Sequence, residues 1–235
     1  MRSASCSALA LLAFTGCLFP SVDDLSSGGD ASPDAPQSSI AFVQVTSTDF
    51  GASPSGTLSF DDAVGAHDTI IAAVSFDNPS ATLTASDSLG SVFTTVVGPI
   101  DSPAPVHRSY LVAAVDVAGG DDAVTLTLSD SASAEFDVYL HEYAGIVSLD
   151  ASAGQAGTST TMTSGPIAVA SAGELVFGFA WTNDQATAGG GFTTRSTFKD
   201  NVTEDRVTDA PGAYAATASQ QGSRWTMLGG AFKGL

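Results

Sequence analysis

The residues of this sequence that could do chemistry gather in the run Glu135–Tyr143, which reads EFDVYLHEY. Apolar and polar residues alternate in this run, which predicts a β-strand whose successive side chains point to opposite faces. Tyr139, His141 and Tyr143 then share one face. If that face is open to solvent, the three side chains form an aromatic strip that could bind a ligand. If a neighbouring strand covers it, they are core residues.

A second binding candidate is the segment Trp181-Thr182-Asn183-Asp184. Binding sites commonly combine an apolar or aromatic surface with a few polar groups that fix the ligand's orientation, and Trp181, Asn183 and Asp184 supply both. Trp181 also continues the alternating apolar residues of the run 175–179, so packing in the core is the competing interpretation.

Glu142 lies on the strand face opposite to His141, because successive strand residues point in opposite directions. The two side chains therefore cannot converge on one substrate or one metal ion. Glu142 follows Leu140 on the face predicted to enter the core, and a buried carboxylate must be paired or neutral. The chain has only 7 Lys+Arg, so we predict a structural ion pair of Glu142 with Arg195 or Arg206.

Catalysis has little support in the sequence. The zinc motif HExxH, the nucleophile motif GxSxG and the phosphate loop GxxxxGK[ST] are all absent. A glycosidase needs two carboxylates that face one cleft, and the nearest arrangement is Glu135 with Asp137, which share a strand face. An exposed polar strand face explains the same pair more simply. We therefore predict no catalytic residues and no cofactor other than a structural metal ion.

Calcium is the one metal ion with some support, because it prefers oxygen ligands and binds many extracellular modules. Acidic pairs occur in predicted turns, and a structural Ca²⁺ would use them. They are Asp61-Asp62 and Asp121-Asp122, followed by the acid–amide pair Asp200-Asn201. None has the spacing of an EF-hand loop, so solvated turn residues are the alternative interpretation.

The elements that must position these residues are about fifteen short strands between residues 39 and 235. Val, Thr, Ile and Phe fill the strands, Gly, Pro, Asp and Ser separate them, and no segment shows a helical period. This pattern predicts an all-β domain, a two-sheet antiparallel sandwich of jelly-roll type. No internal repeat is visible, which favours one domain over two tandem sandwiches with a boundary near residues 148–157.

Five spaced segments resemble a module of secreted bacterial surface proteins that is expected to form a concanavalin-like jelly roll. The resemblance covers most of residues 39–233 and rests on structural motifs. It implies a β-sandwich and an extracellular role, and it carries over no catalytic residues. The segments are Ser86–Gly90, Tyr139–Gly145, Gly173–Gly178, Gly191–Arg195 and Glu204–Arg206.

The N-terminal residues predict export. Residues 1–16 combine Arg2 with a short apolar run, as in a signal peptide, and Phe14-Thr15-Gly16-Cys17 resembles the lipobox of bacterial lipoproteins. The resemblance implies that Cys17 is acylated and becomes the mature N-terminus; an ordinary secretory signal is the alternative. Residues 17–38 are rich in Ser, Gly, Pro and Asp, which predicts a flexible acidic tether ahead of the domain, residues 39–235.

Charge excludes several partners. With 25 Asp+Glu against 7 Lys+Arg the net charge is −18, so neither nucleic acid nor an anionic lipid surface would be bound through a basic face. We predict a lipid-anchored, non-catalytic binding or adhesion module of the cell envelope, in the outer membrane of a Gram-negative bacterium. Its expected ligand is an extracellular glycan or a surface protein. The alternatives are a carbohydrate-active hydrolase on the same fold and a structural spacer.

Overall fold

Eighteen β-strands make up most of residues 40–235, the part of the chain that the computed structural model describes. Within that part the only helical element is a 3₁₀ turn, Phe198–Asp200, and no helix is long and apolar enough to cross a membrane. The predicted all-β class with antiparallel sheets is therefore confirmed. The predicted signal peptide (residues 1–16), the lipidation at Cys17 and the tether (residues 17–38) lie outside the described residues.

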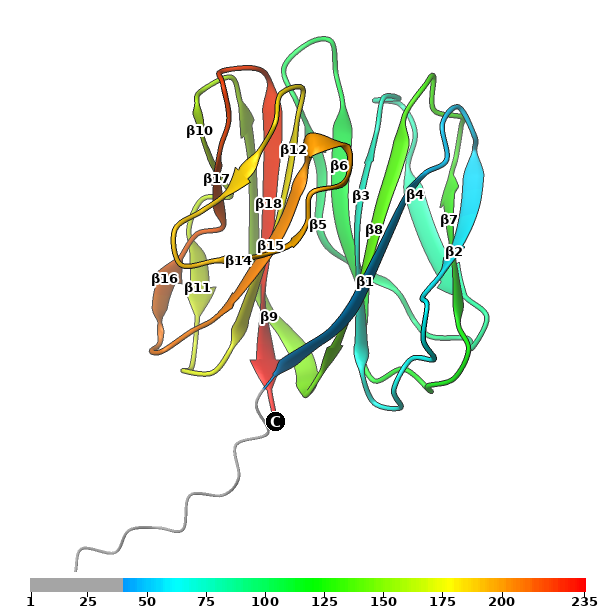
Figure 1. Ribbon diagram of the computed structural model, residues 1–235, viewed down its shortest axis with the longest axis vertical. Helices are drawn as coiled ribbons and strands as arrows, with labels where there is room; N and C mark the ends of the chain where they lie inside the picture. Colours follow the sequence, from blue (N-terminus) through cyan, green and yellow to red (C-terminus); the bar gives the residue numbers. More distant parts are fainter. Residues whose placement is uncertain (1–39) are drawn as a thin grey trace, which may run out of the picture. The chain divides into compact units, whose positions relative to one another are not determined.

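The first half of the domain contains one five-stranded and one three-stranded antiparallel sheet (Figure 1). In spatial order, the larger sheet consists of β1 (Ala41–Asp49), β8 (Phe136–Ala144), β3 (Thr69–Phe76), β6 (Arg108–Ala114) and β5 (Thr94–Asp101). The smaller sheet consists of β2 (Ser55–Ser59), β7 (Ala123–Leu128) and β4 (Leu83–Asp87). The larger sheet thus pairs β1, the first strand of this half in the sequence, with β8, the last.

The second half again has one five-stranded sheet, covered here by two small ones. The larger sheet consists of β14 (Thr193–Ser196), β15 (Val202–Val207), β12 (Leu175–Thr182), β18 (Trp225–Gly234) and β9 (Ile146–Gly157). The small sheets are β10 (Thr161–Thr163), β17 (Thr217–Ser219) and β13 (Thr187–Ala188), and the pair β11 (Ile167–Val169) with β16 (Gly212–Tyr214).

The two halves have the same topology. Numbered from its own first strand, each half has a large sheet in the order 1-8-3-6-5 and an outer layer in the order 2-7-4. In the second half, β10 with β11 and β16 with β17 take positions 2 and 7. The structure therefore contains the repeat that the sequence pattern did not reveal. Both halves nevertheless belong to one compact unit, residues 37–235.

The sheets stack in four layers, with the two large sheets in the middle (Figure 1). A central core lies between the large sheets and includes Leu111, Tyr139, Phe177, Phe179 and Phe232. Separate cores lie beneath the outer layer of each half. Two more layers are present than a two-sheet sandwich has, because each large sheet buries apolar side chains on both faces.

Strands β3 and β12 show this double burial most clearly, since every residue of both strands is buried. The apolar run Ile70–Val74 in β3 is covered on both sides. Alternate residues of β3 enter the first outer core and the central core. A strand buried on both faces reads as a continuous apolar run, as it does here.

The register of the strands defines two ends of the domain. Ala41 pairs with Ala144 at the end where the described chain begins and where β18 finishes, which we call the near end. Asp49 pairs with Asp137, and Thr182 with Trp225, at the opposite, far end. The nine residues of β1, at roughly 3.3 Å each, separate the two ends by about 30 Å.

Candidate functional site

At the far end, polar side chains from both halves surround a hollow of about 220 Å³. Glu135 and Asp137 lie at or just before the start of β8, whereas residues 181–184 span the end of β12 and the two residues after it. The two candidates that the sequence offered separately, the carboxylate pair and the Trp181 segment, are thus brought together. The residues of this acidic hollow are Glu135, Asp137, Trp181, Thr182, Asn183, Asp184, Lys199, Asp200 and Asn201.

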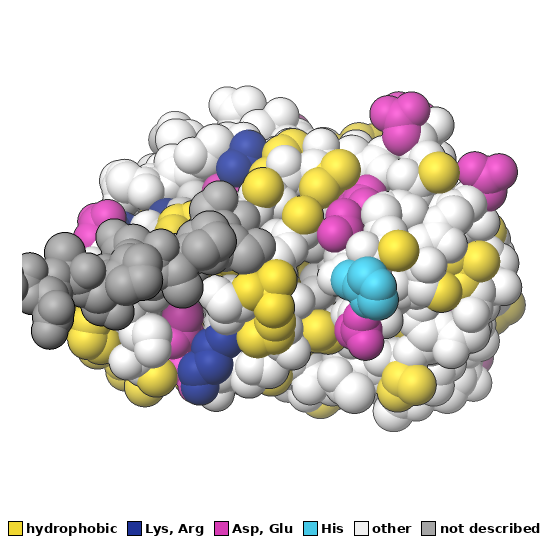
Figure 2. Space-filling view, turned by 90° about the horizontal axis from the view of Figure 1, so that it is seen from below, with side chains coloured by type: hydrophobic (Ala, Val, Ile, Leu, Met, Phe, Trp, Pro, Cys, Tyr) yellow, Lys and Arg dark blue, Asp and Glu magenta, His cyan; other side chains and the backbone are white. Residues whose placement is uncertain are grey.

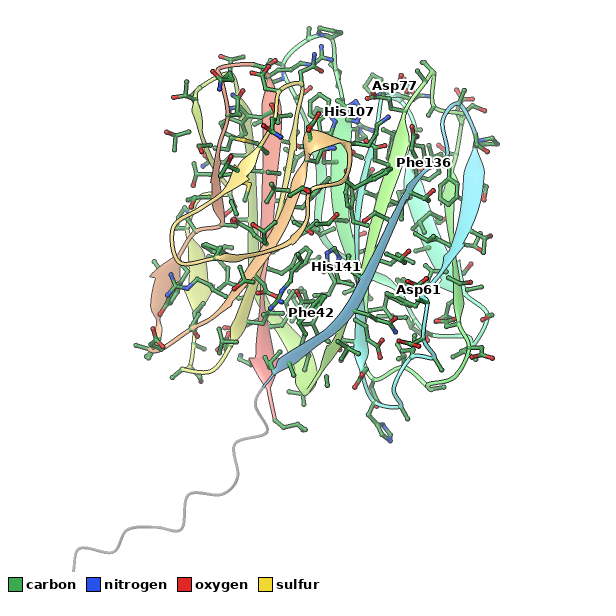
Figure 3. All side chains as sticks on the ribbon, viewed as in Figure 1. Phe42, Asp61, Asp77, His107, Phe136 and His141 are labelled. Atoms are coloured by element: carbon green, nitrogen blue, oxygen red, sulfur yellow. The ribbon has the colours of Figure 1, made fainter. Side chains whose placement is uncertain are left out.

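Strands β8 and β12 place these residues side by side because they lie in the two large sheets that share the central core. Figure 3 shows His107 and Asp77 at the far end, with Phe42 toward the near end and His141 between them. A hollow at this position needs both halves, so neither half would form it alone.

The 3₁₀ turn Phe198–Asp200 forms the third wall of the acidic hollow. Lys199 and Asp200 adopt left-handed backbone angles, with φ of 56° and 62°. This conformation costs about 1 kcal/mol or more for a residue other than glycine. Two hydrogen bonds hold it: the Tyr139 hydroxyl donates to the Phe198 carbonyl (2.9 Å), and the Ala186 N–H donates to the Asp200 carbonyl (2.8 Å).

Asp137 is the most perturbed group of the hollow. Its side chain is 1% exposed, and neither of its carboxylate oxygens accepts a hydrogen bond from the residues that the structure describes. Burial raises its pKa to about 7; Lys199 opposes the rise, and the neighbouring acids Asp49, Glu135 and Asp77 add to it. Near neutral pH the Asp137 carboxyl is therefore divided between its protonated and ionised forms.

Lys199 is the one cation among the described residues that line the acidic hollow. Its Nζ lies 2.9 Å from Asp49 Oδ2, 4.0 Å from Glu135 Oε1 and 4.0 Å from Asp137 Oδ1. The hydrogen bond to Asp49 raises the pKa of Lys199, so the ammonium stays charged. The hollow therefore already holds one positive group among several carboxylates.

Trp181 is a wall of the hollow and not an exposed platform. Its ring stacks on His107, with ring centroids 3.9 Å apart and an interplanar angle of 5°, and the Arg224 guanidinium lies 5.4 Å from the ring centroid. Burial lowers the pKa of His107 to about 3, so the stacked imidazole is neutral. Asn183 is exposed and Asp184 is half-buried, which leaves both accessible to a ligand.

Tyr139, His141 and Tyr143 do not form an exposed aromatic strip. All three share a face as predicted, but that face is fully buried because the large sheet of the second half covers it. Apart from His141 Nδ1, their polar side-chain atoms are hydrogen-bonded across the central core. The partners are the Phe198 carbonyl and Asn201 for Tyr139, Thr203 for His141, and Asp205 for Tyr143.

The predicted ion pair of Glu142 with Arg195 or Arg206 is absent from the described structure, and the prediction is wrong. Glu142 is buried as expected, but it accepts hydrogen bonds from the Gly65 N–H (2.7 Å) and the Gln44 side-chain amide (2.5 Å). It points with Leu140 toward the first outer layer, whereas both arginines belong to the second half. A backbone N–H satisfies the carboxylate in place of a cation.

Arg195 pairs instead with Asp205, through two hydrogen bonds of 2.7 and 3.0 Å. The Tyr143 hydroxyl donates to the same carboxylate at 2.6 Å. Arg206 lies with its guanidinium 5.1 Å from the ring centroid of Tyr214. Both arginines thus have partners other than Glu142, and the Arg195 guanidinium also lies 4.1 Å from the ring centroid of Phe42 in the first half.

The calcium candidates Asp61, Asp62, Asp121 and Asp122 line one shared hollow of about 240 Å³ in the first half. From the sequence, Asp61-Asp62 and Asp121-Asp122 were predicted as two separate candidate pairs. Among the described residues, no group of three or more His, Cys, Asp or Glu side chains has the arrangement of a metal site. Ca²⁺ at this position therefore stays a prediction.

Two larger hollows, of about 480 and 570 Å³, lie at the near end and share Val147 and Leu235. Figure 2 views this end, where hydrophobic side chains gather near the middle of the face. Leu235 is 74% exposed and Val147 is 43% exposed. These hollows are larger than the acidic hollow, but they lack its concentration of buried polar groups.

Sequence reasoning missed Lys199 and His107 as parts of the site. Lys199 is one of only two lysines in the chain and stands directly before Asp200, so its scarcity was a usable signal. His107 gave no signal, because its contact with Trp181 crosses from the first half to the second. Asp200-Asn201, proposed from the sequence as a calcium candidate, instead lines the acidic hollow.

Comparisons with known proteins do not alter this description. No protein-family model matches the chain, and no match is found among the curated proteins or the solved structures. The resemblance to concanavalin-like modules and to the lipobox stays an expectation from the sequence.

Proposed function

We propose that this protein is a non-catalytic binding module that takes a hydroxyl-rich ligand, a glycan in the first instance, into the acidic hollow. The observation that carries the proposal is the concentration of polar groups there. Asn183 and Lys199 can donate hydrogen bonds, while Glu135 and Asp184 can accept them. A sugar, whose hydroxyl groups both donate and accept, matches such a lining.

The size of the hollow supports a small unit of ligand. Sites for drug-sized molecules measure about 300–1,000 Å³. The acidic hollow, at about 220 Å³, is smaller and has room for a single residue of a longer chain. Binding of one terminal or protruding sugar residue fits this volume better than enclosure of an oligosaccharide.

The position of the hollow supports display at a cell surface. The described chain begins at the near end, and the acidic hollow lies at the far end, about 30 Å away. If Cys17 is acylated, the lipid anchor and the tether would join the domain at the near end. The hollow would then lie at the end of the domain opposite to the point where the tether joins it.

The arrangement of carboxylates favours binding over hydrolysis. In a glycosidase, two carboxyl groups flank the scissile bond. Here the Lys199 ammonium lies 4.0 Å from both Glu135 and Asp137, so a cation of the protein already faces both carboxylates.

A glycan array of the compact unit, residues 37–235, tests the proposal. We expect specific binding that falls by about tenfold or more in the double variant Asn183→Ala/Asp184→Ala, because both side chains are accessible in the hollow. The matched control is Asp209→Ala, which removes an exposed carboxylate at the near end and should leave binding unchanged. An array without specific hits, or binding that survives in the double variant, contradicts the proposal.

A second candidate is a hydrolase acting at the same hollow. The observation that favours it is the Asp137 pKa of about 7, a value suited to a general acid. Release of reducing sugar from an array ligand, lost in Asp137→Asn, would replace the binding proposal with this one.

A further inference from the structure

The acidic hollow is built around a positive charge. The Lys199 ammonium is hydrogen-bonded to Asp49 at 2.9 Å and lies within 4.0 Å of two further carboxylates, those of Glu135 and Asp137. One ammonium group is therefore already recognised there by three acidic side chains. The same geometry shows what kind of charge the hollow can accommodate.

One lysine does not balance the acids. Four carboxylic side chains line the hollow, Glu135, Asp137, Asp184 and Asp200, and Asp49 adds a fifth at its edge. Asp137 is 99% buried and accepts no hydrogen bond from any described residue, although it lines the hollow. A buried carboxyl without a partner is costly, and a ligand that donates to it would remove that cost.

A divalent metal ion is not the cation that these carboxylates would bind. No group of three or more acidic, histidine or cysteine side chains in residues 40–235 has the arrangement of a metal site, and Lys199 lies among the carboxylates that would have to converge. An ammonium group requires only hydrogen-bond acceptors within reach, which several separated carboxylates provide.

We infer that the ligand of the acidic hollow is an amino sugar with a free ammonium group, a hexosamine that is not N-acetylated. This inference rests on the proposed glycan-binding function and specifies the class of glycan. The net charge of −18 would also attract such a cationic glycan to the protein and repel an acidic one.

The test compares three probes by calorimetric titration into the compact unit. They are a β-1,4-linked glucosamine trisaccharide, its N-acetylated counterpart, and spermidine as an ammonium ligand that is not a sugar. We expect the free-amine trisaccharide to bind about tenfold tighter than either of the other two. Its binding should also weaken as the ionic strength rises from about 0.05 to about 0.5 M.

Variants show whether binding occurs in the hollow. Glu135→Gln and Asp184→Asn each remove one negative charge from an accessible side chain and should each weaken binding by about threefold or more. Asp209→Asn removes the same charge at the near end and serves as the control. Equal losses in all three variants would mean non-specific attraction and would overturn the inference. Thermal melting of each variant checks that it is folded.

The probes also separate the two proposals. Equal binding of the N-acetylated and free-amine trisaccharides overturns the requirement for an ammonium group and leaves glycan binding in place. Binding of spermidine as tight as that of the free-amine trisaccharide overturns the requirement for a sugar and leaves the requirement for an ammonium group in place. The absence of binding by all three probes overturns the inference, while other hits on the glycan array would still support the proposed function.

Discussion

Replacing Asp205 with alanine should lower the free energy of unfolding by about 3 kcal/mol. Asp205 accepts two hydrogen bonds from Arg195 and one from the Tyr143 hydroxyl, and its side chain is 4% exposed. Without it, a largely buried guanidinium and a buried hydroxyl lose their partner at the interface between the two halves. For a domain of this size the midpoint of thermal unfolding should fall by about 6–12 °C.

Asp209→Ala is the control for Asp205→Ala, because it removes an exposed carboxylate close by in the sequence. Its melting temperature should stay close to that of the wild type. If the free energy of unfolding of Asp205→Ala lies within about 1 kcal/mol of the wild-type value, the hydrogen bonds of Asp205 with Arg195 and Tyr143 do not stabilise the packing of the two halves.

Asp137→Asn should stabilise the protein at pH 8 and leave it almost unchanged near pH 4. The folded-state pKa of Asp137 is raised to about 7 by burial, above the ordinary value of 3.8. The folded protein therefore binds more protons than the unfolded chain between those pH values, and stability falls as pH rises through that window. Asparagine does not ionise, so the variant should gain about 3–4 kcal/mol at pH 8.

Chemical denaturation at several pH values measures this effect. Some pH dependence should remain in the variant, because burial also raises the pKa of Glu204 to about 7. Asp209→Asn removes an exposed charge and should follow the wild type at every pH. A free energy of unfolding of the wild type that is constant between pH 5 and 8 would show that the pKa of Asp137 is not raised by burial in the folded protein.

The cost of an ionised Asp137 bears on function. A buried carboxyl that destabilises the fold near neutral pH is unexpected at a purely structural position, and perturbed groups of this kind cluster at functional sites. Binding of a donor to Asp137 would offset that cost. Ligand binding should therefore be coupled to the protonation of this one residue.

The alternation of residues 136–144 was sufficient to predict both faces of β8. Glu142 shares a core face with Leu140, and Tyr139 lies on the other face with His141, as the period of two requires. The sequence could not predict what covers the second face. That cover comes from β12 and β15, and the face-to-face packing of the two halves leaves no local pattern in β8.

The repeat was missed because the two halves share topology without sharing residues. The equivalent strands β3 and β12 read TIIAAVSF and LVFGFAWT, which have burial in common but almost no identical positions. Local patterning thus predicted the strands and their class, whereas the layering depends on contacts between distant segments.

The acidic hollow was predictable only in parts. The pair Glu135 and Asp137 and the segment 181–184 were each recognised from their residue types, but their meeting depends on the packing of the halves. Lys199 enters through a left-handed turn that no sequence rule assigns to a lysine. The mistaken partner of Glu142 has a similar cause, since charge counting ignores the backbone N–H of Gly65.

The most direct test of the central claim is amide chemical-shift mapping of the compact unit during titration with the β-1,4-linked glucosamine trisaccharide. We expect the perturbed amides to cluster in residues 135–137, 181–184 and 198–201, at the far end. Perturbations that cluster instead around Val147 and Leu235, or that spread evenly over the acidic surface, would contradict the assignment of the acidic hollow as the binding site.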